Sequence, residues 1–337
     1  MKRFAAAFML LVACKAAQKQ GHPPAEKKYM EQSRIEVLDP AMLKLVKKDA
    51  KLEILAEGFK WSEGPLWVNG YLLFSDIPPN KIMKWSEADG LTTYLTPSGY
   101  TGSEPRGGEP GANGLILDQE GRLVMCQHGD RRMARMDAPL DKPVPKFVTL
   151  ADRYEGKRLN SPNDAVYHSS GELYFTDPPY GLVENVDDPA KEIPFQGVYR
   201  VKKDGSVELL YKELSRPNGI AFSRDEKKLY VANSDKNRIW MVFDVKADGS
   251  VENGRLFYDA SAMPEQGAPD GMKVHSSGHI FATGPGGVLV FTPDAKLIGR
   301  IVVGDRCSNV AFDTDERYLY ITANSRLVRV EMQGFRE

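Results

Sequence analysis

The segment Asn218-Gly-Ile-Ala-Phe-Ser223, which continues through the polar turn Asp225–Lys228 into Val231-Ala-Asn233, decides the fold because the chain repeats its pattern six times. Each copy is a short apolar strand, a turn of glycine or charged residues, and a second apolar strand, which is the pattern of a β-hairpin. The copies start 39 to 55 residues apart, a period typical of four-stranded propeller blades. Their first residues are Glu63, Asn113, Asn163, Asn218, Asp270 and Asn309.

These repeats predict an all-β fold, a six-bladed β-propeller with four-stranded blades, although 337 residues alone would also allow two ordinary domains. After Asn309 the chain has room for three strands, whereas Lys51-Leu-Glu-Ile-Leu-Ala56 precedes the first repeat as an unmatched strand. We therefore expect this N-terminal strand to complete the last blade. Such closure of the ring would also remove exposed sheet edges.

The N-terminus has the pattern of an export signal. The charged Met1-Lys-Arg3 and a short apolar run lead to Leu11-Val-Ala-Cys14, which resembles the bacterial lipobox. We expect residues 1–13 to be a lipoprotein-type signal peptide, with a lipid on Cys14 as the membrane contact, and the protein to be periplasmic or membrane-anchored. An ordinary secretory signal is the alternative. Residues 14–34 predict a flexible tether, and the six-bladed propeller domain is expected over 35–337.

Composition favours a small-molecule partner. The 45 basic and 46 acidic residues give a formal net charge of -1, so nothing points to nucleic acid or to an anionic membrane surface. No protein partner is predicted. With Cys14 lipidated, only Cys126 and Cys307 remain, and both lie in apolar strand-like segments. We expect these two to be small buried residues.

The residues that start the repeats predict a cation site. The innermost strands of a propeller line its central channel, so corresponding strand starts meet at one depth. Glu63 and Asp270 would repel each other there unless a cation lay between them. An all-oxygen set of carboxylates and amides favours one Ca²⁺, with Mg²⁺ or Mn²⁺ as alternatives and Zn²⁺ disfavoured without His or Cys. The competing interpretation is that Asn-Gly and Asp-Gly pairs only form turns.

Two further features are expected at the channel mouth. His128 follows the second strand of its repeat and should face the same mouth, whereas His168 and His275 fall in turns at the other end of their strands and are expected to be structural. The loop Thr96–Pro110 is rich in Gly and Pro, and loops of this length near a site are often lids. We expect Arg106 of this loop near the mouth.

Seven motifs together match one known pattern. They are Trp61-Ser-Glu-Gly-Pro65, Gly111-Ala-Asn-Gly114, Gln127-His-Gly-Asp-Arg-Arg132, Ser161-Pro-Asn-Asp164, Phe175-Thr-Asp-Pro-Pro-Tyr-Gly181, Arg216-Pro-Asn-Gly-Ile220 and Pro269-Asp-Gly-Met272. In these motifs the chain resembles the senescence-marker-protein/gluconolactonase family, and most closely its bacterial gluconolactonase-like branch, over about residues 50 to 332. The resemblance implies a six-bladed propeller with a catalytic divalent metal in the tunnel. Its ligands would be Glu63, Asn163, Asn218 and Asp270.

The resemblance also implies an activity, the hydrolysis of sugar lactones. Asp270 is the family's usual candidate for the general base, but a carboxylate bound to a cation is a weak base, so His128 taking the proton is the alternative. Asn113, His128, Tyr180 and Arg106 are the expected substrate contacts.

One position departs from the animal members of the family. They carry an Arg where this chain has Ser161, which weakens any transfer of their substrate. A phosphotriesterase-like hydrolase and a non-catalytic binding propeller are the alternatives to a lactonase.

Overall fold

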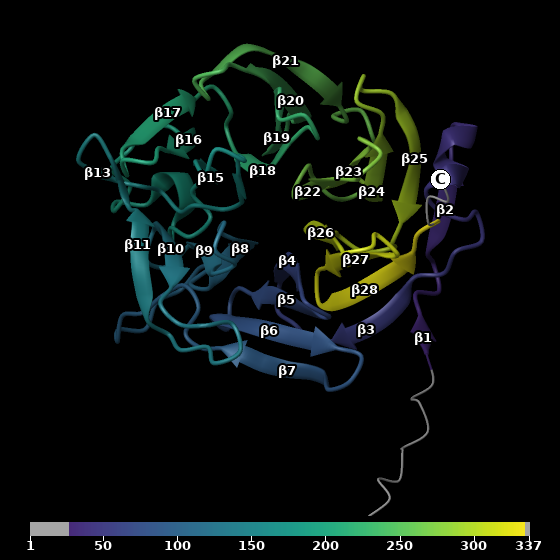
Figure 1. Ribbon diagram of the computed structural model, residues 1–337, viewed down its shortest axis with the longest axis horizontal. Helices are drawn as coiled ribbons and strands as arrows, with labels where there is room; N and C mark the ends of the chain where they lie inside the picture. The colour runs from purple at the N-terminus through teal and green to yellow at the C-terminus, as the bar shows by residue number, and fades with distance from the viewer. Residues whose placement is uncertain (1–26, 334–337) are drawn as a thin grey trace, which may run out of the picture.

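The computed structural model describes residues 27–333, which form a ring of six β-sheets around a central channel (Figure 1). Neighbouring strands within each sheet are antiparallel, and the innermost strand of each sheet comes first in its repeat. The predicted six-bladed β-propeller is therefore confirmed. No α-helix occurs between residues 27 and 333, and two short 3-10 helices, Pro40–Lys44 and Asn185–Asp187, lie outside the blades.

The strands of the blades are as follows. Blade 1 is β4 (Ser62–Val68), β5 (Tyr71–Asp76), β6 (Lys81–Ser86) and β7 (Gly90–Leu95), and blade 2 is β8 (Ala112–Leu117), β9 (Leu123–Gln127), β10 (Arg132–Met136) and β11 (Phe147–Ala151). Blade 3 is β14 (Ala165–Tyr167), β15 (Leu173–Asp177), β16 (Gly197–Val201) and β17 (Val207–Tyr211), and blade 4 is β18 (Pro217–Phe222), β19 (Lys228–Ser234), β20 (Arg238–Val245) and β21 (Val251–Asp259). Blade 5 is β22 (Met272–Val274), β23 (Ile280–Gly284), β24 (Gly287–Phe291) and β25 (Leu297–Val302), and blade 6 begins with β26 (Asn309–Phe312), β27 (Tyr318–Ala323) and β28 (Arg326–Glu331). A small hairpin, β12 (Arg153–Tyr154) and β13 (Lys157–Arg158), follows blade 2.

The N-terminal strand β3 (Glu53–Glu57) completes blade 6, as predicted, by pairing with β28 so that Ala56 faces Leu327. The chain therefore closes the ring with strands from its two ends. An additional strand, β2 (Arg34–Val37), pairs with β25 and gives blade 5 a fifth strand. The outer edges of both of these blades are thus covered by the segment that precedes the first repeat.

Among residues 27–333, regular structure begins at residue 28, inside the segment 14–34 that was expected to be a flexible tether. Strand β1 (Lys28–Tyr29) pairs with the outer edge of β3 and so makes the last blade five-stranded. The predicted signal peptide, residues 1–13, and Cys14 lie outside the described residues. Across the described part of the chain, no helix is long and apolar enough to cross a membrane.

The core lies between neighbouring blades, because each sheet packs both faces against other sheets. Every residue of β9, β15 and β23 is buried, as expected for strands covered on both sides. Between blades 1 and 6, Trp67 stacks on Tyr320 with ring centroids 5.1 Å apart. Cys126 and Cys307 are both free and buried.

The inner strands approach each other closely at the channel. A Cβ on Gly64 would lie 2.2 Å from the main-chain oxygen of Asn113, and one on Gly219 would lie 2.1 Å from that of Asp270. The glycine that follows each of these repeat starts is therefore required by the neighbouring blade. This contact explains the Glu-Gly and Asn-Gly pairs better than turn formation alone does.

Candidate functional site

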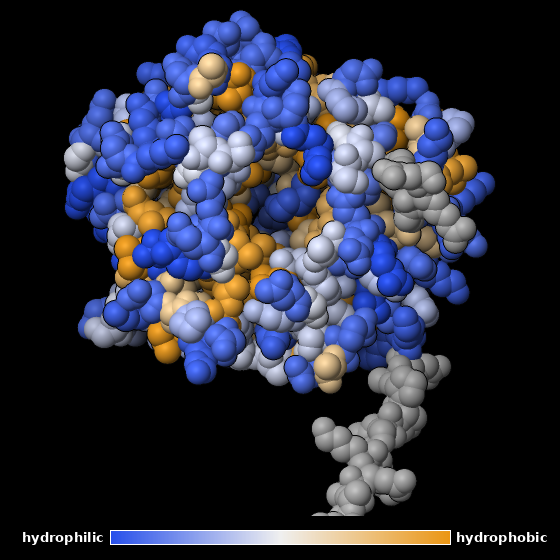
Figure 2. All heavy atoms as spheres, viewed as in Figure 1, coloured by the Kyte–Doolittle hydropathy of each residue, from blue (hydrophilic) through white to orange (hydrophobic). Residues whose placement is uncertain are grey.

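A pocket of about 420 Å³ opens at the centre of the ring, which is within the roughly 300–1,000 Å³ typical of small-molecule sites. Figure 2 shows this face of the molecule hollowed at the middle of the ring, with hydrophilic residues in its depth. Five of the six residues that start the repeats are among those that line the pocket: Glu63, Asn113, Asn163, Asn218 and Asp270. The propeller thus brings together side chains that are up to 207 positions apart in sequence.

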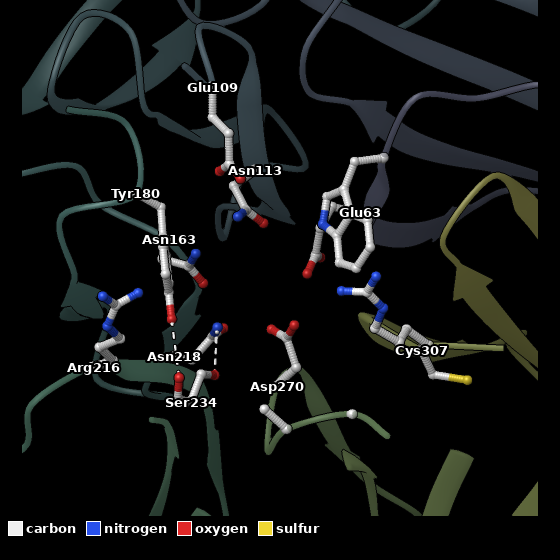
Figure 3. A pocket seen from close by; sticks show the side chains of 14 residues that line it. Glu63, Glu109, Asn113, Asn163, Tyr180, Arg216, Asn218, Ser234, Asp270 and Cys307 are labelled. Carbon is white, nitrogen blue, oxygen red and sulfur yellow. Dashed lines mark hydrogen bonds between the residues drawn. The ribbon is translucent and has the colours of Figure 1, made fainter. Parts of the chain in front are cut away.

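The side chains of these five residues point toward one another across the pocket (Figure 3). Three of their oxygens, Asn113 Oδ1, Asn163 Oδ1 and Asp270 Oδ1, are buried and have no hydrogen-bond partner. Buried polar atoms are almost always satisfied, so three such oxygens at one point indicate a missing partner with positive charge or donors. A cation of the hard, oxygen-preferring type fits this donor set.

Hydrogen bonds from the second strands hold the ring residues in place. Ser75 in β5 donates to the main-chain oxygen of Asn113 at 2.8 Å, and Thr176 in β15 donates to that of Asn218 at 2.7 Å. The side-chain nitrogen of Asn218 donates to Ser234 Oγ at 2.9 Å, which leaves the amide oxygen of Asn218 directed elsewhere. In the bonds of Ser75 and Thr176 the hydroxyl belongs to one blade and its acceptor to the next, so these two bonds link the blades at the site.

Asp177, the last residue of the second strand of blade 3, also fixes the loop that leads into the first strand of that blade. Asp177 accepts the main-chain N–H groups of Asn160 and Ser161, each at 2.7 Å. Ser161 in turn donates through its hydroxyl to the Pro178 oxygen at 2.6 Å and accepts from Gly181 N–H. Ser161, which stands where animal relatives are expected to carry an Arg, therefore has a structural role in this chain, because it joins its own loop to the Pro178–Gly181 segment.

The two carboxyl groups of the ring are electrostatically unfavourable without a counter-charge. Burial raises the pKa of Glu63 to about 8, with the charge of Asp164 adding to the effect and a hydrogen bond from Gly64 N–H opposing it. Burial also raises the pKa of Asp270, and the charges of Glu63, Asp164 and Glu109 raise it further. A divalent cation among these groups would offset their repulsion.

Within residues 27–333 no three His, Cys, Asp or Glu side chains converge as in a conventional metal centre. The ring supplies only two carboxylates, and amide oxygens make up the rest of the donor set.

A second polar layer, which sequence reasoning missed, adjoins the ring. The Asn309 side-chain nitrogen lies 3.3 Å from Glu63 Oε2 and 3.5 Å from Asp164 Oδ2, so it joins two buried carboxyl groups. Burial raises the pKa of Asp164, and the positive charge of Lys273 opposes this. The sequence did carry a signal, because Asp164 stands where most repeats have Gly after the first residue.

His128 is completely buried, and the residues that line the pocket do not include it. Its Nδ1 lies 3.1 Å from Oε2 of Glu109, a residue that does line the pocket. Arg106 is also absent from the pocket lining: its guanidinium donates to the main-chain oxygens of Gly129 and Gly181. Neither residue touches the pocket directly, and their roles toward substrate stay predictions.

The pocket wall carries Tyr180, which the sequence predicted, and three groups that the sequence did not assign to the site. Tyr180 was expected there and lines the pocket; burial and the charge of Asp270 raise its pKa to about 12, so it keeps its proton at neutral pH. Arg216, Arg306 and Trp61 line the pocket as well. The Arg216 guanidinium lies over the Tyr180 ring, 5.4 Å from its centroid. The wall therefore offers donors of hydrogen bonds around the ring of acceptor oxygens.

The two histidines expected to be structural lie between blades. His168 Nε2 is 3.3 Å from Glu226 Oε2, and His275 Nε2 is 3.0 Å from Glu316 Oε2. Each glutamate also accepts the main-chain N–H of the serine that directly follows its histidine partner, which is Ser169 or Ser276. These contacts tie the turns of consecutive blades together.

Comparisons with known proteins agree on one family. The model of the SMP-30/gluconolactonase/LRE-like region matches residues 61–325. A gluconolactonase from Zymomonas mobilis is 38% identical over 317 residues, which are 90% of this chain and 87% of that protein.

Solved structures give the same result. A gluconolactonase from Xanthomonas campestris has a TM-score of 0.78 and 30% identity, and the alignment covers 92% of this chain and 99% of that one. A calcium-binding regucalcin from Agrobacterium tumefaciens has a TM-score of 0.65 over 84% of this chain and 95% of its own, but at 20% identity the likeness concerns the fold alone.

Proposed function

The chain belongs to the SMP-30/gluconolactonase/LRE-like family, and we propose that it opens sugar lactones with the help of one divalent cation, Ca²⁺ being favoured. That it is a lactone-hydrolysing enzyme follows from its relatives, which include two gluconolactonases matched over 90% and 92% of the chain. The observation that carries the cation is the convergence of two buried carboxyl groups with amide oxygens that lack partners.

We assign the cation to Glu63, Asn163, Asn218 and Asp270. Two carboxylates offset the charge of one divalent ion, and carboxylate and amide oxygens are the ligands that Ca²⁺ prefers. Mg²⁺ demands a more rigid octahedral set, and Zn²⁺ favours nitrogen and sulfur ligands, which this ring does not supply. Asn113 also faces the pocket with an unpartnered oxygen, and we assign it to the substrate.

Hydrolysis of a lactone needs a polarised carbonyl, a deprotonated water and a proton for the departing ring oxygen. A bound divalent cation would polarise the lactone carbonyl and offset the charge that develops on its oxygen. Tyr180 holds its proton and can donate a hydrogen bond to a sugar hydroxyl, and Arg216 can donate beside it. Asn113 can accept from another hydroxyl. These residues would orient the sugar while the floor of the pocket carries the reactive carbonyl.

The proposal is tested with a panel of aldonolactones and one phosphotriester, assayed with and without chelator. We expect turnover of an aldonolactone above the spontaneous rate, loss of that turnover with EDTA, and its return with Ca²⁺. Preferred turnover of the phosphotriester would favour a phosphotriesterase-like enzyme. No turnover of any compound with Ca²⁺, Mg²⁺ or Mn²⁺ would refute the enzyme and leave a binding propeller.

We also propose that the protein is exported and lipid-anchored through Cys14. This rests on the N-terminal sequence pattern alone, because residues 1–26 are outside the described part of the chain. Cell fractionation of the full-length protein and of Cys14→Ala would test it. The wild type should sediment with membranes, and the variant should be released into the soluble periplasmic fraction.

A further inference from the structure

Glu109 is a carboxylate of the pocket wall that the proposed cation set leaves unused. It lines the pocket with its side chain about one-third exposed, on the opposite side from Asp270. Figure 3 shows its side chain pointing from the rim into the pocket, toward Asn113. Its charge contributes to the raised pKa of Asp270, so the two carboxyl groups act on each other across the space that a substrate would fill.

The His128 ring lies directly behind this carboxylate. Its Nδ1 and Glu109 Oε2 are 3.1 Å apart, an ion-pair distance, although the angles fall short of a good hydrogen bond. Neither nitrogen of the buried ring has another partner among the described residues. Catalytic hydrogen bonds are often poorly aligned before substrate binds. His128 is thus placed to hold Glu109 and to stabilise its charge without reaching the substrate itself.

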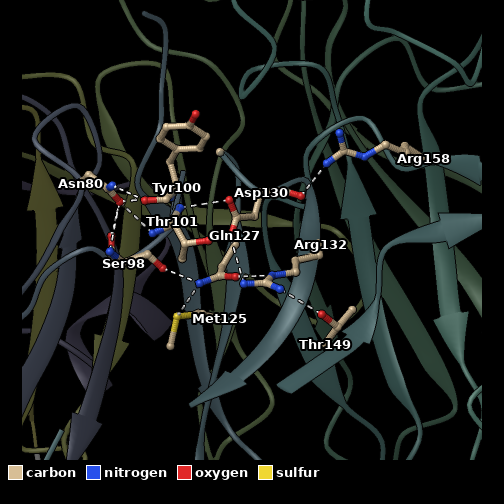
Figure 4. Close-up of polar contacts among 12 residues, drawn as sticks. Asn80, Ser98, Tyr100, Thr101, Met125, Gln127, Asp130, Arg132, Thr149 and Arg158 are labelled. Atoms are coloured by element: carbon tan, nitrogen blue, oxygen red, sulfur yellow. Dashed lines mark hydrogen bonds and ion pairs between the residues drawn. The ribbon is translucent and has the colours of Figure 1, made fainter. Parts of the chain in front are cut away.

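The loop that carries Glu109 is fixed to the propeller at several points. Figure 4 shows part of this network: Asn80 Oδ1 accepts the N–H of Ser98 at 3.0 Å and of Gly99 at 2.7 Å, and Thr101 Oγ1 donates to Asp130 at 2.7 Å. Arg106, three residues before Glu109, donates to two main-chain oxygens in other loops. A loop held in this way suits a positioned catalytic group better than a moving lid.

We propose that Glu109 is the residue that transfers the proton during lactone opening and that His128 is its positioning residue. This inference rests on the lactonase function proposed above. Glu63 and Asp270 are poor bases when they hold a cation, and His128 is sealed from the pocket, so Glu109 is the remaining pocket carboxylate.

The proton transfers balance in two steps. The oxygen of water forms a bond to the lactone carbonyl carbon, the π electron pair of the carbonyl moves onto its oxygen, and the Glu109 carboxylate takes one proton from the water. When the carbonyl re-forms, the bond from its carbon to the ring oxygen breaks with its electron pair. Protonated Glu109 then gives its proton to that ring oxygen. The product is the open-chain hydroxy acid, and Glu109 is again a carboxylate.

The test compares wild type, Glu109→Gln and Glu104→Gln on glucono-δ-lactone with Ca²⁺ present. Glu104 is an exposed glutamate of the same loop and serves as the matched control. We expect E109Q to lower kcat by roughly 100-fold to 10,000-fold, the usual contribution of a general base, with KM and calorimetric Ca²⁺ affinity unchanged. E104Q should behave as wild type. Formate should restore part of the kcat of Glu109→Ala, because it can enter the vacated space and accept the proton.

Several results would overturn the assignment. An E109Q kcat within about threefold of an active wild type would return the role to Asp270, and loss of Ca²⁺ binding in E109Q would make Glu109 a ligand. Failure of formate to restore any activity to E109A would leave Glu109 with orientation only. The outcomes above all require an active wild type. If the wild type itself shows no lactone turnover, the proposed function is refuted together with the role of Glu109.

The role of His128 is tested separately with His128→Gln. If His128 acts through Glu109, the single variant H128Q has a lower kcat than the wild type. The double variant of H128Q and E109Q then has the same kcat as E109Q. Losses that multiply in the double variant would show that His128 acts independently and would overturn its positioning role. Thermal unfolding of each variant checks that the fold is retained.

Discussion

Gly219→Ala should push two blades apart at the proposed cation site. Gly219 follows the proposed ligand Asn218, and a Cβ built there lies 2.1 Å from the main-chain oxygen of the proposed ligand Asp270. Ordinary contact at such an atom begins at 3.4 Å, so blades 4 and 5 would have to separate by more than 1 Å. The backbone of Gly219 is not in the left-handed region, so the new methyl group is the whole perturbation.

The expected loss of stability lies at the upper end of the range for overpacking, about 3 kcal/mol, because main-chain atoms on both sides cannot rotate away. Gly107→Ala is the control, since its nearest atom would be Val183 Cγ1 at 3.7 Å. Urea unfolding followed by tryptophan fluorescence gives both free energies of unfolding.

The same separation should weaken Ca²⁺ binding, measured by calorimetry, by roughly tenfold or more, since Asn218 and Asp270 stand on the two sides of the gap. A G219A protein within about 0.5 kcal/mol of G107A and with wild-type Ca²⁺ affinity would refute the reasoning, because overpacking at a rigid contact should exceed that difference.

Three further predictions concern the cation, a buried carboxyl group and the pocket wall. Ca²⁺ at 100 times its Kd should stabilise the wild type by about 2.7 kcal/mol in urea unfolding, and Glu63→Gln should lose most of this gain. Burial raises the pKa of Asp177 to about 7, although the hydrogen bonds from the main-chain N–H groups of Asn160 and Ser161 oppose the shift. Asp177 therefore favours the folded state at about pH 4, and this contribution of up to about 4 kcal/mol is lost as the pH rises through 7. The free energies of unfolding of the wild type and of Asp177→Asn, measured across that range, should converge or cross. A constant difference between them would contradict the shift. Arg216→Gln should raise the KM for an aldonolactone about fivefold through loss of one hydrogen bond, with kcat nearly unchanged, and steady-state kinetics would measure it.

The repeat alone was enough to predict the ring. Each copy of the pattern that starts at Asn218 forms its hairpin from residues close in sequence, and hairpins of one kind stack into a closed ring. The strand expected over Lys51–Ala56 had no partner in its own region, so its pairing with the last blade could also be predicted. The same reasoning placed Glu63 and Asp270 at the axis, because equivalent positions of equivalent strands must meet there.

The parts of the site that lie outside the repeat required the tertiary structure. Glu109 sits in a loop with no periodicity, and its approach to His128 depends on loop contacts such as that of Arg106 with Gly181, 75 residues away. The pairing of β2 with β25 joins residues that are 262 to 268 positions apart, and nothing local selects that edge. Sequence thus determined the positions that repeat, since local strand and turn preferences set them. Long-range packing decided which unrepeated loop residues complete the pocket, because only the closed ring brings them together.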